Sequence, residues 1–265
     1  MKKSISIILG LVLVLSVFAS CSGKGKQEEP EQPTPSNSTE DVANKSEQTP
    51  VKEAITLTEA EEVKNDYIYE KYHYEGECTA GNEKQEYKFR LPQLKSTSSE
   101  AEEINRKIIG KYESLVKEQI KYAENPDMFY DNIYWQSYIN NGLLSIVIVD
   151  DNFAHGYKSY SVYVFDTKTE KAVSNPEVLA AAGISENDFI SKAKETAKEL
   201  FSKVDFGNMD NAENIKKERL EYMLSKDNIS INTPMFIDDS GTLNAIVEIG
   251  QAGGADYKYE IIKIK

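Results

Sequence analysis

The sequence predicts an α+β domain in which helices pack against a mostly antiparallel β-sheet. Three observations predict this class. Runs of alternating apolar and polar residues are joined by turn signals such as Asn140-Asn141-Gly142. Stretches with apolar residues three and four positions apart predict amphipathic helices. Strand patterns then return at the C-terminal end of the chain.

Two alternating runs predict the first hairpin. Residues 66–75 alternate apart from a slip at Lys71, and residues 86–91 alternate until Pro92. Tyrosines dominate the first run, and such residues line a sheet-to-helix interface more often than a sugar-stacking face. These tyrosines are Tyr67, Tyr69, Tyr72 and Tyr74.

The second hairpin is predicted at residues 133–139 and 143–149, on either side of the Asn-Asn-Gly turn. Residues 160–165 form the next predicted strand. The stretch Asp150–Tyr160, with the sequence DDNFAHGYKSY, therefore lies between two strands at one end of the sheet. It contains one of the 2 histidines in the chain.

Helices are predicted before and after this β-rich region. Residues 98–123 carry a single apolar stripe and begin with serines that can cap a helix. Asn175-Pro176 fits an N-cap followed by a proline at the first helical position. Residues 185–203 and 211–225 predict two further helices. The closing strands are expected at residues 229–237, 243–249 and 257–264.

Residues 1–20 predict a lipoprotein signal peptide. Two lysines precede an apolar run at residues 5–18, which is shorter than the roughly 20 residues of a membrane span. The run ends in Phe18-Ala19-Ser20-Cys21, which resembles a lipobox, so we expect Cys21 to carry acyl chains. An ordinary signal peptide with an incidental cysteine is the alternative reading.

The rest of the chain divides into a tether and a folded domain. Residues 21–55 comprise the lipidated cysteine and a polar segment that we expect to be disordered, because it cannot bury enough apolar surface to offset its ordering entropy. Residues 56–265 are predicted to form one α+β envelope binding domain. The protein is thus expected at the extracytoplasmic face of the cell membrane, held there by its lipid anchor only.

Net charge and cysteine content limit the partners. The chain carries a formal charge of −13; cleavage before Cys21 leaves 29 basic and 44 acidic residues, a net charge of −15. Such a field disfavours nucleic acid and anionic membrane surfaces and favours a cationic protein, although acidic charge also serves solubility. Cys78 has no partner once Cys21 is acylated, so no internal disulfide is expected.

The motifs of catalysis and metal binding are weak. Asp150, Asp151 and His155 have ligand chemistry, but carboxylates and glycine are also typical of turns. The sequence has no GxSxG motif and no cysteine–histidine signature. We therefore predict no enzyme, no metal site and no cofactor. A glycosidase-like pair among the many carboxylates stays an open alternative.

Several short motifs resemble a bacterial envelope family. They are Phe89-Arg90-Leu91-Pro92-Gln93-Leu94, the helical Glu103-Ile104-Asn105, the strand 143–149, Ala154-His155-Gly156 and YVFDTKTEK at residues 163–171. The chain resembles the extracellular domain of the lysozyme-sensing anti-sigma-V factor, which also occurs beside the catalytic domain of some peptidoglycan deacetylases. Asn152-Phe153 stands where that family has Gly-Gly, and Glu170 stands where it has glycine.

The resemblance implies a non-catalytic binding domain with a lysozyme as partner, as inhibitor or decoy. The loop is then the expected partner-binding surface, in which apolar side chains make contact and the aspartates steer a basic protein. Its residues are Asp150, Asp151, Phe153, His155, Gly156 and Tyr157. An envelope structural module that binds wall glycan or a neighbouring protein is the main alternative, and a carboxylate-based hydrolase is another.

Replacing Cys21 by serine is expected to move the protein from the membrane fraction to the soluble fraction, because acyl chains are the predicted anchor. Cell fractionation and metabolic labelling with a palmitate analogue measure this. Cys78→Ser is the matched control and should stay membrane-bound and labelled. Membrane retention of the labelled Cys21→Ser variant would contradict the predicted lipidation site.

Overall fold

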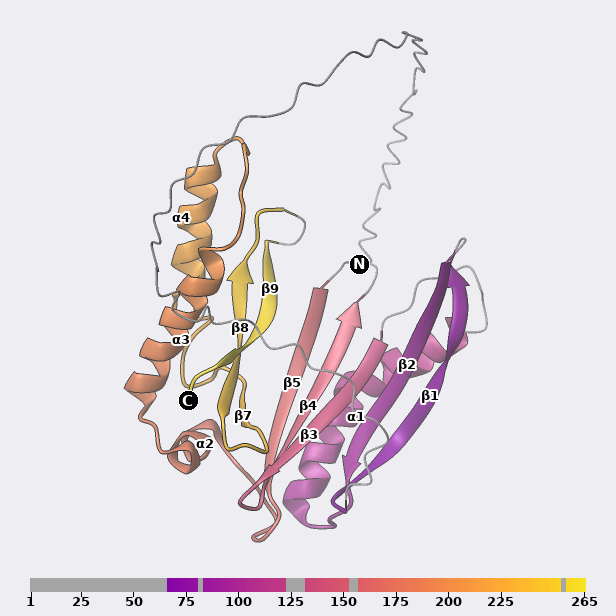
Figure 1. Ribbon diagram of the computed structural model, residues 1–265. Helices are drawn as coiled ribbons and strands as arrows, with labels where there is room; N and C mark the ends of the chain where they lie inside the picture. Colours follow the sequence, from indigo (N-terminus) through magenta and orange to yellow (C-terminus); the bar gives the residue numbers. More distant parts are fainter. Residues whose placement is uncertain (1–65, 81–82, 123–131, 153–156, 254–255) are drawn as a thin grey trace, which may run out of the picture. The chain divides into compact units, whose positions relative to one another are not determined.

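The computed structural model describes residues 66–265 apart from residues 81–82, 123–131, 153–156 and 254–255 (Figure 1). Within this part, four helices and two sheets confirm the predicted α+β class. The predicted signal peptide and tether lie outside the described residues. None of the helices in the described part combines the length and apolar content that a bilayer span requires.

The larger sheet has six strands in the order β1-β2-β3-β4-β5-β6. Neighbouring strands are antiparallel except β2 and β3, which pair in parallel at Phe89 and Ile133. The strands are β1 (Ile68–Ala80), β2 (Glu83–Leu94), β3 (Asn132–Asn140), β4 (Leu143–Asn152), β5 (Tyr157–Asp166) and β6 (Lys171–Ala172).

The smaller sheet is antiparallel, in the order β7-β8-β9, and comes from the C-terminal part of the chain. Its strands are β7 (Met235–Ile237), β8 (Leu243–Gly250) and β9 (Tyr257–Lys263). The helices are α1 (Ser99–Tyr122), α2 (Asn175–Ala182), α3 (Glu186–Phe201) and α4 (Ala212–Met223).

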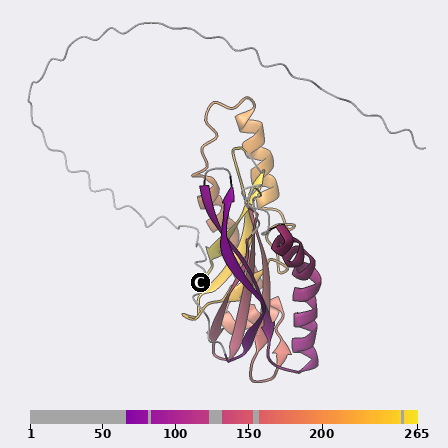
Figure 2. The same cartoon turned by 90° about the vertical axis from the view of Figure 1, so that its right-hand side faces the viewer.

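Strand alternation sorts the apolar side chains into layers. Ile146 and Ile148 of β4 belong to the cluster that contains the apolar stripe of α1, whereas Val147 and Val149 point the other way. Helix α1 accordingly runs along one side of the six-stranded sheet (Figure 2). The predicted stripe is confirmed: Ile104, Ile108, Tyr112 and Val116 are buried, and Leu115 and Ile120 pack against them.

The two sheets face each other through a small apolar cluster. Val147 and Val149 of β4 meet Phe236, Ile246 and Ile261 of the smaller sheet. The alternate residues of β8 point away from this interface and pack against α2, α3 and α4. The described part is therefore layered as helix, sheet, sheet and helices.

Turn chemistry agrees with the predicted hairpins. Asn141 and Gly142 have φ of 53° and 92°, as a type I′ turn between β3 and β4 requires. Glu170 has φ of 55°, a left-handed conformation that glycine adopts more readily. The slip at Lys71 is a β-bulge between Glu70 and Tyr72.

Two predicted boundaries were wrong. Strand β2 continues through Pro92, because Pro92 lies opposite Glu70 at the bulge, where the ladder is already interrupted. The N-cap of α2 is Ser174 rather than Asn175: the backbone N–H of Ser174 donates to Glu177 at 2.7 Å.

The predicted strand at residues 229–237 was also wrong over most of its length, since only Met235–Ile237 is extended. The hydroxyl of Thr233 donates to the carbonyl of Asn228 at 3.0 Å, and both side chains are buried. These local bonds replace a strand ladder with a turn-rich segment.

Replacing Phe236 by alanine tests the contact between the sheets. Phe236 is 2% exposed and stacks on Tyr138 with ring centroids 5.2 Å apart. Losing this ring should lower the free energy of unfolding by about 3–5 kcal/mol, measured by urea denaturation. The half-exposed Ile139 is the control, and its change to alanine should cost under about 1 kcal/mol. If Phe236→Ala lowers the free energy of unfolding as little as the control does, the contact between the sheets contributes little to stability.

Candidate functional site

The predicted partner-binding stretch is only partly described. Asp150 and Asp151 lie in β4 rather than in a loop, and Tyr157 begins β5, where only its backbone is described. Phe153, His155 and Gly156 lie outside the described residues.

The two aspartates point to opposite faces of the sheet, because they are consecutive in a strand. Asp150 lies on the α1 face, where the hydroxyl of Ser159 is 3.5 Å from its Oδ2. Asp151 lies on the other face, where its Oδ2 is 2.7 Å from Lys158 Nζ. The sheet therefore does not bring the two carboxylates together, and Lys158 locally offsets the charge of Asp151.

The other histidine belongs to a structural network between strands. His73 Nδ1 lies 2.5 Å from Glu70 Oε2, and Glu70 Oε1 accepts hydrogen bonds from Arg90 at 2.7 Å and Trp135 at 2.6 Å. Both oxygens of Glu70 are thus occupied by β1, β2 and β3. Across the described residues, no group of three or more His, Cys, Asp or Glu side chains is placed to hold a metal ion.

The tyrosines of the first strand were expected at a sheet-to-helix interface, and this expectation was largely wrong. Tyr67, Tyr69 and Tyr74 are exposed, whereas Tyr72 packs against the core beside α1. Tyr72 donates to Glu113 at 2.8 Å, and with Lys71 it lowers the pKa of that carboxyl to about 2.

A groove runs along the outer edge of β5. One cavity of about 310 Å³ is lined by the consecutive residues Tyr160–Val164 on one side and by Asn232 and Pro234 on the other. A second cavity of about 330 Å³ shares Tyr160, Asn232 and Pro234 with the first. We call these two adjoining cavities the β5 groove.

The edge of β5 presents backbone groups to this groove. Thr167 N donates to Gly142 O at 2.8 Å, and Val173 N donates to Val164 O at 2.9 Å. Since backbone groups alternate in direction along an antiparallel strand, the N–H and C=O of Tyr160 and Val162 point away from β4. On this outer side, no strand in the described part of the chain pairs with these two residues.

The carboxylate of Glu248 lines the second cavity, which we call the Glu248 pocket. Tyr160 of β5, Tyr222 of α4 and Tyr259 of β9 line it together with Glu248 of β8. The hydroxyl of Tyr222 donates to Glu248 Oε2. The remaining lining residues are Lys111, Ser159, Asp227, Asn228, Ser230, Asn232, Thr233, Pro234 and Ile246.

Buried Asn228 places Glu248. Its side-chain amide donates to the carbonyls of Met223 at 2.8 Å and of Glu248 at 2.9 Å, and its Oδ1 accepts from Glu248 N at 2.8 Å. One side chain therefore joins the end of α4 to β8. This linkage is the local reason that Tyr222 and Glu248 face each other.

Glu248 also sets the electrostatics of the pocket. The hydrogen bond to its carboxylate raises the pKa of Tyr222 well above the ordinary range, and burial adds to this rise. Burial raises the pKa of Tyr160 to about 12. Burial and, secondarily, the charge of Glu248 raise the pKa of Tyr259. The pocket thus holds protonated phenols around an acidic group.

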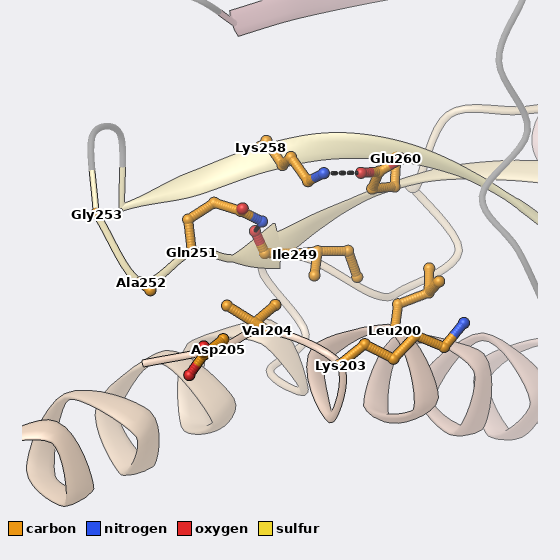
Figure 3. Close-up of a pocket in the computed structure, with 10 residues that line it drawn as sticks. All are labelled: Leu200, Lys203, Val204, Asp205, Ile249, Gln251, Ala252, Gly253, Lys258 and Glu260. Carbon is orange, nitrogen blue, oxygen red and sulfur yellow. Dashed lines mark hydrogen bonds and ion pairs between the residues drawn. The ribbon is translucent and has the colours of Figure 1, made fainter. Parts of the chain in front are cut away.

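A third hollow of about 540 Å³ lies between the end of α3 and the β8–β9 hairpin (Figure 3). Leu200, Val204 and Ile249 form its apolar side. Lys258 and Glu260 pair with each other at 2.5 Å, as the dashed line in Figure 3 marks. Because these two charges satisfy each other, this hollow is a weaker candidate for recognising a charged ligand than the β5 groove.

The sequence analysis did not single out the residues of the Glu248 pocket. They come from α1, β5, α4, the segment 227–234 and the β8–β9 hairpin, so no single spacing motif joins them. Only the pair Glu248 and Tyr259 is local, because these residues lie opposite each other in the predicted hairpin. Alternation in the last strand places Tyr257 and Tyr259 on one face, and this was the local signal that could have drawn attention to them.

Comparison with known proteins adds no assignment. No protein-family model matches the chain, and no curated protein matches it. The functional argument therefore rests on the sequence and on the geometry of the β5 groove.

The Glu248→Gln variant is expected to lower the pKa of Tyr222. Ionising Tyr222 beside a carboxylate creates two like charges, so a neutral amide makes loss of the proton easier. An ultraviolet titration of the phenolates, with ring assignment by NMR, measures this. Tyr138 provides an internal control, because burial and then Asp238 and Asp239 raise its pKa to about 12. A Tyr222 pKa that is unchanged would contradict the described contact.

Proposed function

We propose that this chain is an exported lipoprotein whose folded domain binds a cationic, cell-wall-active protein such as a lysozyme, without being an enzyme itself. In this proposal Cys21 anchors the protein at the extracytoplasmic face of the cell membrane, and residues 21–55 act as a tether. The observation that carries the proposal is the β5 groove, which combines backbone groups that no described strand pairs with, tyrosine rings and a carboxylate.

The composition of the groove favours a protein partner. Tyrosines are frequent at interface centres because each offers a large apolar ring and a hydroxyl that hydrogen-bonds. Tyr222 and Tyr259 are 37% and 39% exposed, so their rings retain surface that a partner can cover. The backbone of Tyr160 and Val162 adds donors and acceptors along the same edge.

Net charge favours a cationic partner. The chain carries −13 in total, and such a field raises the association rate of a basic protein. Since Lys158 offsets Asp151, we attribute the attraction to the whole field and to the groove rather than to the two aspartates alone. The resemblance to the extracellular domain of the lysozyme-sensing anti-sigma-V factor supports a lysozyme as this partner.

Purified residues 56–265 are expected to bind a lysozyme at low ionic strength, and the affinity should fall by roughly tenfold or more as salt shortens the Debye length below about 10 Å. Isothermal calorimetry measures the affinity, and a wall-hydrolysis assay shows whether the bound lysozyme is inhibited. A lysozyme acetylated on its lysines, which has lost its positive charges, is the control and should bind weakly. Absence of binding at low salt overturns the proposal.

Wall glycan is the second candidate ligand. The amides and hydroxyls along the Glu248 pocket, together with partly exposed Tyr222 and Tyr259, are also groups that hydrogen-bond and stack on sugars. Co-sedimentation of the domain with isolated cell wall, in the absence of lysozyme, separates this candidate from a protein partner.

A hydrolase is tested in the same assay. Asp227 and Glu248 line one cavity, which is the feature that favours this alternative. Release of soluble sugars from isolated wall by the domain alone, and its loss in Glu248→Gln, would replace binding with catalysis as the function.

A further inference from the structure

Glu248 has no basic partner within the described residues. None of the ion pairs there involves it, and its Oε2 accepts a hydrogen bond from the neutral hydroxyl of Tyr222. The side chain is half-buried, and a half-buried carboxylate without a counter-ion is costly. An incoming cation therefore gains both the charge interaction and the relief of this cost.

The rings around the carboxylate add a second attraction for a cation. Tyr160 and Tyr259 meet edge to face with centroids 6.4 Å apart, and Tyr222 lies 4.6 Å from the ring of Tyr257. Aromatic faces attract cations through their quadrupole, by about 0.5–2 kcal/mol. The high pKa values of these phenols keep the rings protonated and neutral at physiological pH.

The basic residue that lines the same cavity is turned to other groups. Lys111 Nζ lies 2.6 Å from Ser161 Oγ and 5.0 Å from the ring centre of Tyr112. Both contacts lie on the α1 face of β5, whereas Glu248 belongs to the smaller sheet on the other face. Lys111 thus does not form an ion pair with the carboxylate of Glu248.

The hydrogen-bond acceptors that Glu248 still offers favour a lysine over an arginine as its partner. A guanidinium binds a carboxylate best through two parallel hydrogen bonds, which need both oxygens. Tyr222 donates to one oxygen of Glu248, and Tyr259 also hydrogen-bonds to this carboxylate, so a compact ammonium suits the site better than a bidentate guanidinium. Pro234 and Ile246 also line the cavity and offer apolar contact to an aliphatic stem.

We infer that the Glu248 pocket receives a lysine side chain of the partner protein, with its ammonium bound to Glu248 and its stem lying among the tyrosine rings. This inference rests on the proposed function, because it names the chemical anchor of the cationic partner. It identifies Glu248 as the residue of the groove that selects for positive charge.

An NMR titration with acetyl-Gly-Lys-Gly-amide tests the inference directly. The norleucine peptide, which keeps the stem and removes the charge, is the matched ligand control. We expect the lysine peptide to shift resonances of Tyr160, Tyr222 and Tyr259, and the norleucine peptide to bind at least tenfold more weakly. Glu248→Gln should reduce lysine-peptide affinity about tenfold.

Glu221→Gln is the matched protein control, because it removes one exposed charge from α4 outside the pocket and should leave the affinity within about twofold of the wild type. Equal losses in Glu248→Gln and Glu221→Gln, equal binding of both peptides, or no shift of the three tyrosines each overturn the inference. Tighter binding of glucosamine than of the lysine peptide also overturns it, because the ammonium would then come from a wall sugar.

The lysozyme titration separates this inference from the proposed function. If the lysine peptide binds but lysozyme does not, the lysine-binding role of the pocket stands and the proposed lysozyme partner is rejected. If lysozyme binds the wild type and Glu248→Gln equally well, lysozyme stands as the partner, but the Glu248 pocket is not where it is anchored.

Discussion

The contact between the two sheets is the constraint on which the candidate site depends. Val147 and Val149 of β4 meet Phe236, Ile246 and Ile261 of the smaller sheet, and the same packing places β5 beside β7 and β9. The groove exists because β5 is paired along β4, whereas within the described residues the segment Lys171–Val173 covers its outer edge only at Val164–Asp166. A free strand edge is normally a liability for aggregation. Here the segment around residues 227–234 forms the opposite wall of a groove, so the edge is partly shielded.

The buried amide of Asn228 links this architecture to the chemistry of the pocket. Its hydrogen bonds join the carbonyl end of α4 to the backbone of Glu248, so they hold the helix that carries Tyr222 against the strand that carries Glu248. A preorganised carboxylate loses little conformational entropy on binding, which favours affinity. A separate bond, from the hydroxyl of Thr233 to the backbone carbonyl of Asn228, favours a turn in residues 229–234 over an extension of β7.

Charge acts on two length scales in the proposed binding mode. The net −13 acts over the Debye length and mainly affects how fast a basic protein arrives. Glu248 acts at contact distance, where partial exclusion of water strengthens its interaction and where side-chain geometry selects the partner. Asp150 and Asp151 contribute to this long-range net charge rather than to contact with a partner, since each already interacts with a side chain of β5.

The sequence by itself determined the elements of local origin: the α+β class, the Asn-Asn-Gly hairpin, the stripe of α1 and the cap of α3 at Ser185. These features arise from periodicity and turn chemistry, which act over a few neighbouring residues. Only the tertiary structure decided that β4 extends through Asp150 and Asp151, and that Glu248 shares a cavity with Tyr160 and Tyr222. The pocket depends on how one sheet packs on another, and no local pattern encodes such a contact between residues nearly a hundred positions apart.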